Sequence, residues 1–143
     1  MKRLVLAVLI LVAFFSCSNK MQEEVLTRHE DGSRKEVRYY VKNDDGSRNY
    51  VRETWYYMEG MKHLDGPIVD GKRNGVFETY YKSGALMSKG TFVDGIREGE
   101  AFTYYENGNV KYQGSYVNGK ECGIWKFYEE NGELDKEVNR DLR

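Results

Sequence analysis

Two neighbouring stretches of equal length decide the fold: residues 71–94 read GKRNGVFETYYKSGALMSKGTFVD, and residues 95–118 read GIREGEAFTYYENGNVKYQGSYVN. Glycines, a tyrosine pair and an aliphatic residue return in the same order after 24 residues, and residues 119–142 carry most of the pattern a third time. A fixed period of this length, without insertions, indicates a repeat protein in which each copy is one supersecondary unit.

The spacing within one copy predicts a β-hairpin. Residues 76–81 are rich in β-branched and aromatic side chains, residues 82–84 form a tight turn, and residues 86–93 form the return strand. A helix with glycine at four positions of each unit would lose roughly 1 kcal/mol at each of them. We therefore predict an all-β fold, an elongated single-layer antiparallel sheet of tandem 24-residue β-hairpin repeats.

The repeat extends towards the amino terminus. Subtracting one period from the pattern of residues 71–94 predicts a fourth unit at 47–70, with a rewritten first half. Residues 25–46 then form a β lead-in that caps the array of residues 47–143, because terminal units of repeat arrays are commonly atypical. The complete units are 47–70, 71–94, 95–118 and 119–142.

Three local features refine this expectation. Asp-Gly turns at 31–32 and 45–46 indicate hairpins, with strands at 36–41 and 50–57 on either side of the second turn. Glycine inside the return strands, Gly90 and Gly114, predicts that an aromatic ring from a neighbouring hairpin covers each gap. The last unit loses the pattern, so residues 133–143 either fray or form a helical cap.

The amino-terminal residues indicate export. Lys2 and Arg3 precede an apolar run of 12 residues, too short for the ~20 residues that span a bilayer, so residues 1–16 read as a signal peptide. Cys17, placed at the cleavage point, resembles the lipidated cysteine of bacterial lipoproteins. That resemblance implies a lipid anchor in the membrane, a tether at 17–24, and, from Ser18, outer-membrane sorting in the cell envelope with the domain periplasmic or surface-exposed. An ordinary cleaved signal peptide is the alternative.

No residue pattern supports catalysis, a cofactor or a metal. The two histidines, His29 and His63, have no partner at metal-ligand spacing, and turn residues are the simpler interpretation. Cys122 lacks an activating base at any meaningful spacing, and the acidic turn at 43–46 lacks the downstream glutamate of a calcium loop. The net charge of −1 provides no basic field for nucleic acid.

The unit resembles the MORN repeat variant family, which includes proteins labelled YwqK-type antitoxins. The resemblance rests on Tyr-Tyr, a glycine three residues later, an aliphatic residue, a further glycine, an aromatic residue and Asn/Asp-Gly, as in 80–95 and 104–119. It covers about 56–134 and implies a row of stacked β-hairpins with a scaffold role. Ile96 and Glu129 depart from the pattern, which leaves the turn at 96 and the edge at 129 outside any common binding surface.

Paired aromatic residues form the strongest candidate for recognition. Cross-strand packing alone explains them as the core of a single layer. Adjacent tyrosines of a strand point to opposite faces, so packing does not easily use both, and packing combined with binding is the second interpretation. The sequence thus predicts a non-catalytic, lipid-anchored binding or scaffold module for a protein or a glycan, with an antitoxin-like protein that binds a toxin as the alternative. The candidate binding face comprises Tyr80, Tyr81, Tyr104, Tyr105, Tyr116, Trp125 and Tyr128.

Overall fold

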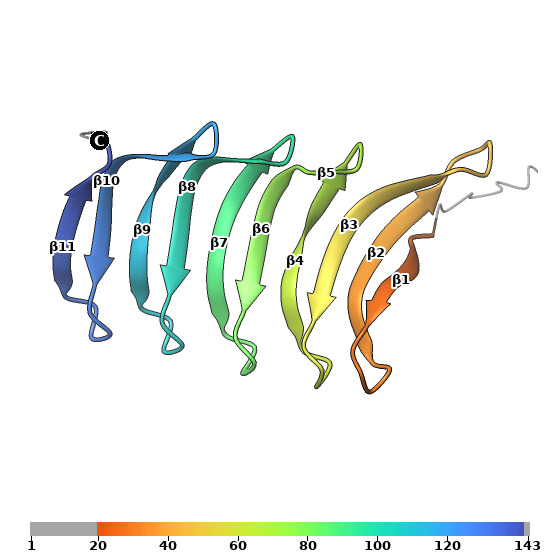
Figure 1. The fold of residues 1–143 in the computed structure, drawn as a ribbon, viewed down its shortest axis with the longest axis horizontal. Helices are drawn as coiled ribbons and strands as arrows, with labels where there is room; N and C mark the ends of the chain where they lie inside the picture. Colours follow the sequence, from red (N-terminus) through yellow and green to blue (C-terminus); the bar gives the residue numbers. More distant parts are fainter. Residues whose placement is uncertain (1–19, 142–143) are drawn as a thin grey trace, which may run out of the picture.

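The computed structural model describes residues 20–141 as one open antiparallel sheet. Each strand pairs with the next in the chain, except that the short β5 pairs only with β4 and β6 takes the next place in the sheet. Figure 1 shows the strands side by side from β1 at one end to β11 at the other. The strands are β1 (Gln22–Arg28), β2 (Arg34–Lys42), β3 (Arg48–Tyr56), β4 (Lys62–Val69), β5 (Lys72–Arg73), β6 (Gly75–Tyr80), β7 (Leu86–Val93), β8 (Ile96–Tyr104), β9 (Val110–Val117), β10 (Lys120–Tyr128) and β11 (Leu134–Asn139).

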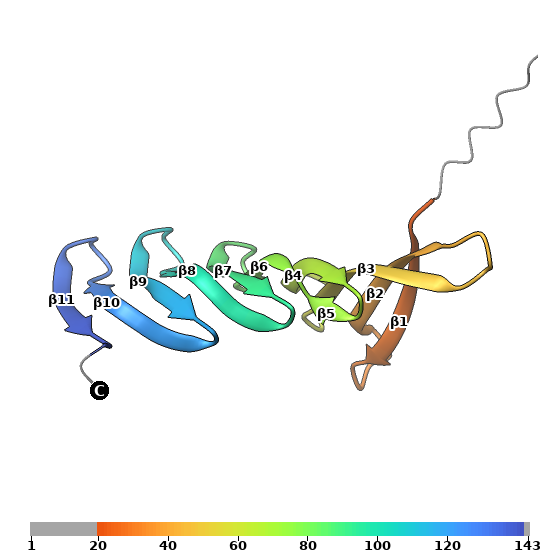
Figure 2. The same cartoon turned by 90° about the horizontal axis from the view of Figure 1, so that it is seen from above.

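The sheet is a single layer. Seen from above, the described chain forms one twisted band of hairpins, with no second layer over it (Figure 2). The all-β, single-layer prediction is confirmed, including the return strand of residues 86–93, which is β7. Within residues 20–141 there is no helix of the length and apolar character that a membrane span needs.

The β1–β2 and β2–β3 connections are both five-residue turns, closed by His29 N–H to Ser33 O and by Asn43 N–H to Ser47 O. From β4 onward, two kinds of turn alternate along the band. At one end of the hairpins, Asp-Gly or Asn-Gly pairs occupy two-residue turns in which both residues have positive φ, as for Asp94 (49°) and Gly95 (86°). This is the geometry of a type I′ turn, whose twist matches that of the strands it joins. At the other end, five-residue turns close with a backbone hydrogen bond such as Tyr81 N–H to Ala85 O at 2.9 Å.

The first strand begins earlier than the sequence indicates. β1 starts at Gln22, so residues 22–24 lie in the sheet rather than in the tether predicted for 17–24. Their polar side chains have partners there: Tyr40 donates a hydrogen bond to Gln22 Oε1 (2.9 Å), and Glu24 pairs with Arg48 (2.7 Å). The residues before 20, including Cys17, lie outside the described part of the chain.

The carboxyl end corrects a second expectation. Residues 134–139 neither fray nor form a helix but make β11, which pairs with β10. The strand satisfies the backbone groups of β10 that would otherwise form an open edge, and Lys126 pairs with Glu137 at 3.1 Å across the two strands. The charged side chains that made this segment look unstructured now lie on the edge strand, where charge discourages pairing with another chain.

Candidate functional site

One row of residues crosses the sheet at the same height and on the same face. Cross-strand partners share a face. Glu53 pairs with Gly66, Phe77 with Gly90 and Ala101 with Gly114, each glycine lying on the return strand of the same hairpin. The row across the sheet therefore contains Glu53, Phe77, Ala101 and Trp125. These four residues occupy equivalent positions, 24 residues apart. We call the face that carries Phe77 and Trp125 the ring face.

The rings of this row lie on glycine. A Cβ atom added to Gly114 would overlap the Trp125 indole, and one added to Gly66 would overlap the Phe77 ring. Glycine is thus required because the ring of the following hairpin occupies the place of its side chain. The prediction that an aromatic ring covers Gly114 is therefore correct.

The equivalent prediction for Gly90 is wrong. Here the following hairpin supplies Ala101 in place of a ring, and a Cβ on Gly90 would meet only the Ala101 methyl at 3.6 Å and Arg97 Nη1 at 3.7 Å. The middle unit therefore keeps the glycine but lacks the aromatic ring that its two neighbours place over it.

The second tyrosine of each pair connects one unit to the next. Tyr81 donates its hydroxyl hydrogen bond to Tyr104 O at 2.7 Å, and Tyr105 donates to Tyr128 O at 2.9 Å. Tyr57 does the same to Tyr80 O, and His29 Nε2 to Tyr56 O, both at 2.9 Å. The repeated contact forms a ladder along one end of the hairpins.

This ladder explains two features of the sequence. The last unit has Glu129 where the others have the second tyrosine, and no further unit follows it within the described residues to accept a hydrogen bond. His29 occupies the corresponding turn position at the start of the row, because its N–H bonds to Ser33 O just as that of Tyr81 bonds to Ala85 O. The side chain of a turn histidine thus starts the ladder.

The seven candidate binding residues do not share one face. Tyr116 and Trp125 lie on the ring face with their rings edge to face at 5.3 Å. Tyr81 and Tyr105 lie at the turns and belong to the ladder. The first tyrosines of the pairs lie on the opposite face, where Tyr80 bonds to Glu78 and the Tyr104 ring stacks with that of Phe102; these first tyrosines are Tyr80, Tyr104 and Tyr128.

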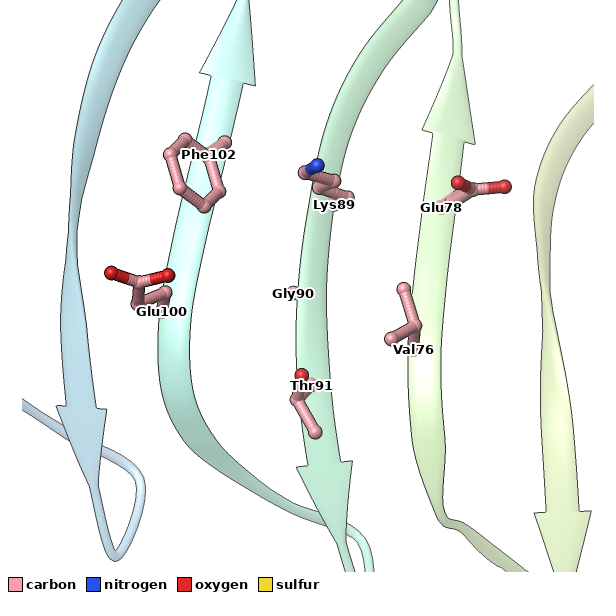
Figure 3. A pocket seen from close by; sticks show the side chains of 7 residues that line it. All are labelled: Val76, Glu78, Lys89, Gly90, Thr91, Glu100 and Phe102. Carbon is pink, nitrogen blue, oxygen red and sulfur yellow. The ribbon is translucent and has the colours of Figure 1, made fainter.

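That opposite face contains a trough over β6, β7 and β8. The cavity measures about 400 Å³, and the side chains that line it rise from three adjacent strands, as Figure 3 shows. Its lining comprises Val76, Glu78, Lys89, Gly90, Thr91, Glu100 and Phe102. We call this face the trough face.

A second trough of about 120 Å³ lies one repeat further along. Each of its residues is the equivalent, 24 positions later, of a residue in the first trough, and Glu100 and Phe102 belong to both. Its lining comprises Glu100, Phe102, Gln113, Gly114, Ser115, Ile124 and Lys126. The two troughs are therefore one surface feature, repeated by the hairpin period.

The trough combines one aromatic ring with side chains of both charges. Lys89 Nζ lies 5.1 Å from the centre of the Phe102 ring, an attractive cation–π arrangement. Tyr80 donates a 2.6 Å hydrogen bond to Glu78 at the rim. Burial raises the pKa of the Tyr80 hydroxyl, and the bond to Glu78 raises it further, to about 12. The tyrosine thus remains a neutral hydrogen-bond donor across physiological pH.

Among residues 20–141 no three histidine, cysteine or acidic side chains come together in a way that could hold a metal ion. The His63 ring packs on Tyr57 at 4.6 Å, and Cys122 Sγ donates a weak hydrogen bond to Ser115 O at 3.5 Å. Both contacts are structural. Neither residue has a nucleophile–base pairing around it.

The aromatic residues of the sequence do not reveal the trough. The lining contains one ring, Phe102, together with the carboxylates of Glu78 and Glu100 and the amine of Lys89. None of these residues is unusual within a single copy of the repeat. The signal that could have revealed it is the 24-residue period itself, read on the face of each strand opposite Phe77 and Trp125.

The comparisons with known proteins identify the repeat. The family model described as MORN repeat variant matches three segments, residues 73–94, 97–118 and 121–141. These three segments are similar to MORN-type repeats. The family is that of a repeat module, consistent with a binding or scaffold role.

Two further comparisons add little. No curated protein sequence matches the chain. Among solved structures, the crystal structure of TarM matches 87% of this chain at 17% sequence identity with a TM-score of 0.33. The chain spans 22% of the length of that protein.

Proposed function

We propose that this protein is a non-catalytic binding module that recognises an extended segment of a protein partner on its trough face. The observation that carries the proposal is the recurrence of the trough after one repeat, with Glu100 and Phe102 shared between the two copies. Equivalent subsites in a row suit a ligand that itself runs in a line across the strands.

The spacing of the subsites supports a peptide ligand. Neighbouring strands lie about 4.8 Å apart, so two hairpin-related troughs lie roughly 9.6 Å apart. A chain in the polyproline II conformation turns once every three residues and rises about 9.3 Å in doing so. Every third side chain of such a segment would therefore face the next trough. A glycan that runs across the strands is the alternative ligand.

The charges of the trough argue against nucleic acid as the ligand. The first trough holds two carboxylates, Glu78 and Glu100, and one amine, Lys89. Nucleic-acid binding depends on cations that neutralise the phosphates. The two carboxylates of this surface would repel those phosphates. Polar groups of both signs instead favour a partner that presents both donors and acceptors.

We further propose that Cys17 carries a lipid and holds the module at the membrane of the cell envelope. Only four residues separate Cys17 from the first strand at Gln22. The five residue steps between them span at most about 18 Å at 3.3–3.6 Å per residue. The amino-terminal end of the sheet would then sit close to the lipid surface, and the repeats would extend away from the tether.

Cys17→Ser tests the anchor in the full-length protein. We expect the variant to move from the membrane fraction to the soluble fraction after cell fractionation, because the acyl chains supply roughly 0.8 kcal/mol for each buried methylene. Metabolic labelling with a fatty acid should lose its signal at the same time. Unchanged membrane retention would refute the anchor and leave the trough proposal standing.

The trough is tested by capture of partners from envelope extracts with the purified full-length protein. We expect Glu100→Lys with Phe102→Ala to lower partner recovery at least tenfold, because both residues serve both troughs. Val117→Ala is the matched control, since Val117 is 50% exposed and lies outside both linings.

Circular dichroism should show the same strand content in the double variant and its control. Recovery of the same partner in equal amounts by the double variant would overturn the trough proposal. A captured glycan would replace the protein ligand, and a single partner that is toxic when expressed alone would support the antitoxin alternative.

A further inference from the structure

On the ring face, the middle repeat has alanine at the position where the neighbouring repeats have an aromatic ring. Phe77 lies over Gly66 and Trp125 lies over Gly114, but the equivalent Ala101 leaves Gly90 uncovered by a ring. Each of the three glycines lies 11 residues before the residue that corresponds to it on the next hairpin. Gly90 pairs directly with Ala101 across β7 and β8, whereas the strand pairings do not include Gly66 with Phe77 or Gly114 with Trp125. At the two equivalent positions the chain itself places a flat aromatic ring.

The space at Ala101 is large enough for such a ring. A cavity of about 280 Å³ opens beside Ala101. Its lining comprises Ser88, Lys89, Arg97, Ala101, Phe102, Thr103, Tyr112, Tyr116 and Trp125. A volume of about 150 Å³ is enough to hold a benzene ring. Tyr112 and Tyr116 both pack on Trp125, with ring centres 6.1 and 5.3 Å away, so the wall of the cavity is held in place.

The rim of the cavity also differs from its equivalents in charge. In the preceding unit, Arg73 packs on Phe77 at 4.9 Å and is neutralised by Glu53 at 2.7 Å. In the following unit the same position is Glu121, which pairs with Arg140 at 2.9 Å. Arg97 packs between Phe92 and Tyr116, at 5.3 Å from each ring, and forms no ion pair within residues 20–141.

We propose that the cavity beside Ala101 is a binding site for an aromatic side chain of a protein partner, next to an acidic residue that pairs with Arg97. The ring replaces the side chain that Ala101 lacks and stacks against the Tyr116–Trp125 wall. The acidic group supplies the carboxylate that Glu53 supplies to Arg73. Lys89 and Phe102 line both this cavity and the first trough, so the two sites are neighbours. Arg97 and Ala101 line this cavity and neither trough, so variants of these two residues test it separately.

The two tryptophans of the chain provide a direct test. The full chain, labelled with nitrogen-15, is titrated with the blocked dipeptide N-acetyl-aspartyl-phenylalaninamide while the indole N–H signals are followed. We expect a saturable shift of the Trp125 signal and none of the Trp55 signal, because only Trp125 lines the cavity. Equal shifts of both signals, or no shift of either, would overturn the proposal.

Two control peptides separate the ring from the charge. N-acetyl-aspartyl-leucinamide keeps the carboxylate without the ring and should leave Trp125 unshifted. N-acetyl-asparaginyl-phenylalaninamide keeps the ring and should bind several-fold more weakly than the aspartyl peptide. Equal binding of all three peptides would show general adhesion in place of a ring site.

Two variants then locate the site. Ala101→Phe should raise Tm and abolish the Trp125 shift, since the protein would fill its own cavity as it does with Phe77. Arg97→Gln leaves the cavity open and should remove the preference for the aspartyl over the asparaginyl peptide. Should Ala101→Phe fail to fold, Arg97→Gln decides alone: a preference that survives this variant contradicts the proposed pairing.

Discussion

The two halves of the sheet place opposite kinds of chemistry at the same position of the backbone. Glu53 in β3 occupies the place that Phe77 and Trp125 hold one and three repeats later, and all three are at most 5% exposed. In the first half, buried carboxylates are held by arginine and lysine; in the second, rings lie on glycine. The difference shows that the repeat preserves the backbone pairing and leaves the chemistry of the interior free to change.

The centre of the charged half is Asp65. Its carboxylate, 3% exposed, accepts hydrogen bonds from Arg52 Nε and Nη2 (both 2.6 Å), Lys62 Nζ (2.8 Å) and Thr54 Oγ1 (2.9 Å). Burial by itself would raise the pKa of Asp65, but these hydrogen bonds outweigh it and lower the pKa from 3.8 to about 2. A buried charge with this many partners is stable because every acceptor position is used.

Trp125→Ala should have the largest effect, because it removes the ring that covers Gly114 and is itself 2% exposed. We expect a loss of about 3–5 kcal/mol in the free energy of unfolding, measured in urea. Ile124→Ala is the control, since Ile124 is the preceding residue, points to the other face and is 55% exposed. Equal losses in the two variants would mean that the ring–glycine contact does not hold the second half together.

Asp65→Asn should rank second. Loss of the charge weakens hydrogen bonds from Arg52 and Lys62, and we expect the free energy of unfolding at pH 7 to fall by about 2–3 kcal/mol. We expect a smaller loss of stability than for a fully buried ion pair. The side chains of Arg52 and Lys62 are 44% and 51% exposed, so both charges remain hydrated in the variant. Glu59→Gln, which breaks the exposed pair with Lys82, should leave stability unchanged.

The pH dependence provides an independent check on Asp65. Its pKa is lower in the folded than in the unfolded chain, so its contribution is complete above about pH 4 and disappears as the pH falls towards 2. The stability gap between the wild type and Asp65→Asn should therefore narrow over this range. A gap that stays constant down to pH 2 would contradict the lowered pKa.

Tyr105→Phe should have the smallest effect. It removes the hydroxyl that donates to Tyr128 O and leaves the ring in place, so we expect a loss of about 1 kcal/mol in urea unfolding. Tyr81→Phe should give a similar value, as both residues make the same contact one repeat apart. No loss in either variant would show that the ladder follows from the packing and contributes nothing to stability.

Much of the architecture can be predicted from the sequence because the repeat makes local signals agree. Asp94-Gly95 and Asn118-Gly119 demand turns with positive φ, and the β-rich runs between glycines demand strands. The prediction failed for β11, whose six residues are mostly charged. Its pairing depends on the open edge of β10, which no local pattern in residues 134–139 reveals.

The candidate site was harder to predict. The sequence shows that tyrosines are frequent, but it does not show that the hydroxyls of Tyr81 and Tyr105 donate hydrogen bonds to the next repeat. It also could not show that Glu78 and Lys89 come together with Phe102 from three strands. Such clusters depend on the register between strands, because the register determines which residues that are far apart in the chain become neighbours.

The sequence by itself determined the period, the hairpins and the single layer, because glycine, turn dipeptides and alternating side chains act within a few residues of one another. Only the tertiary structure decided what each equivalent position does. Glu53, Phe77, Ala101 and Trp125 have the same place in the repeat, yet one binds an arginine, two cover a glycine and one leaves a cavity. The reason is physical: the role of a side chain on a sheet is set by the adjacent strands, and those carry different residues at every step.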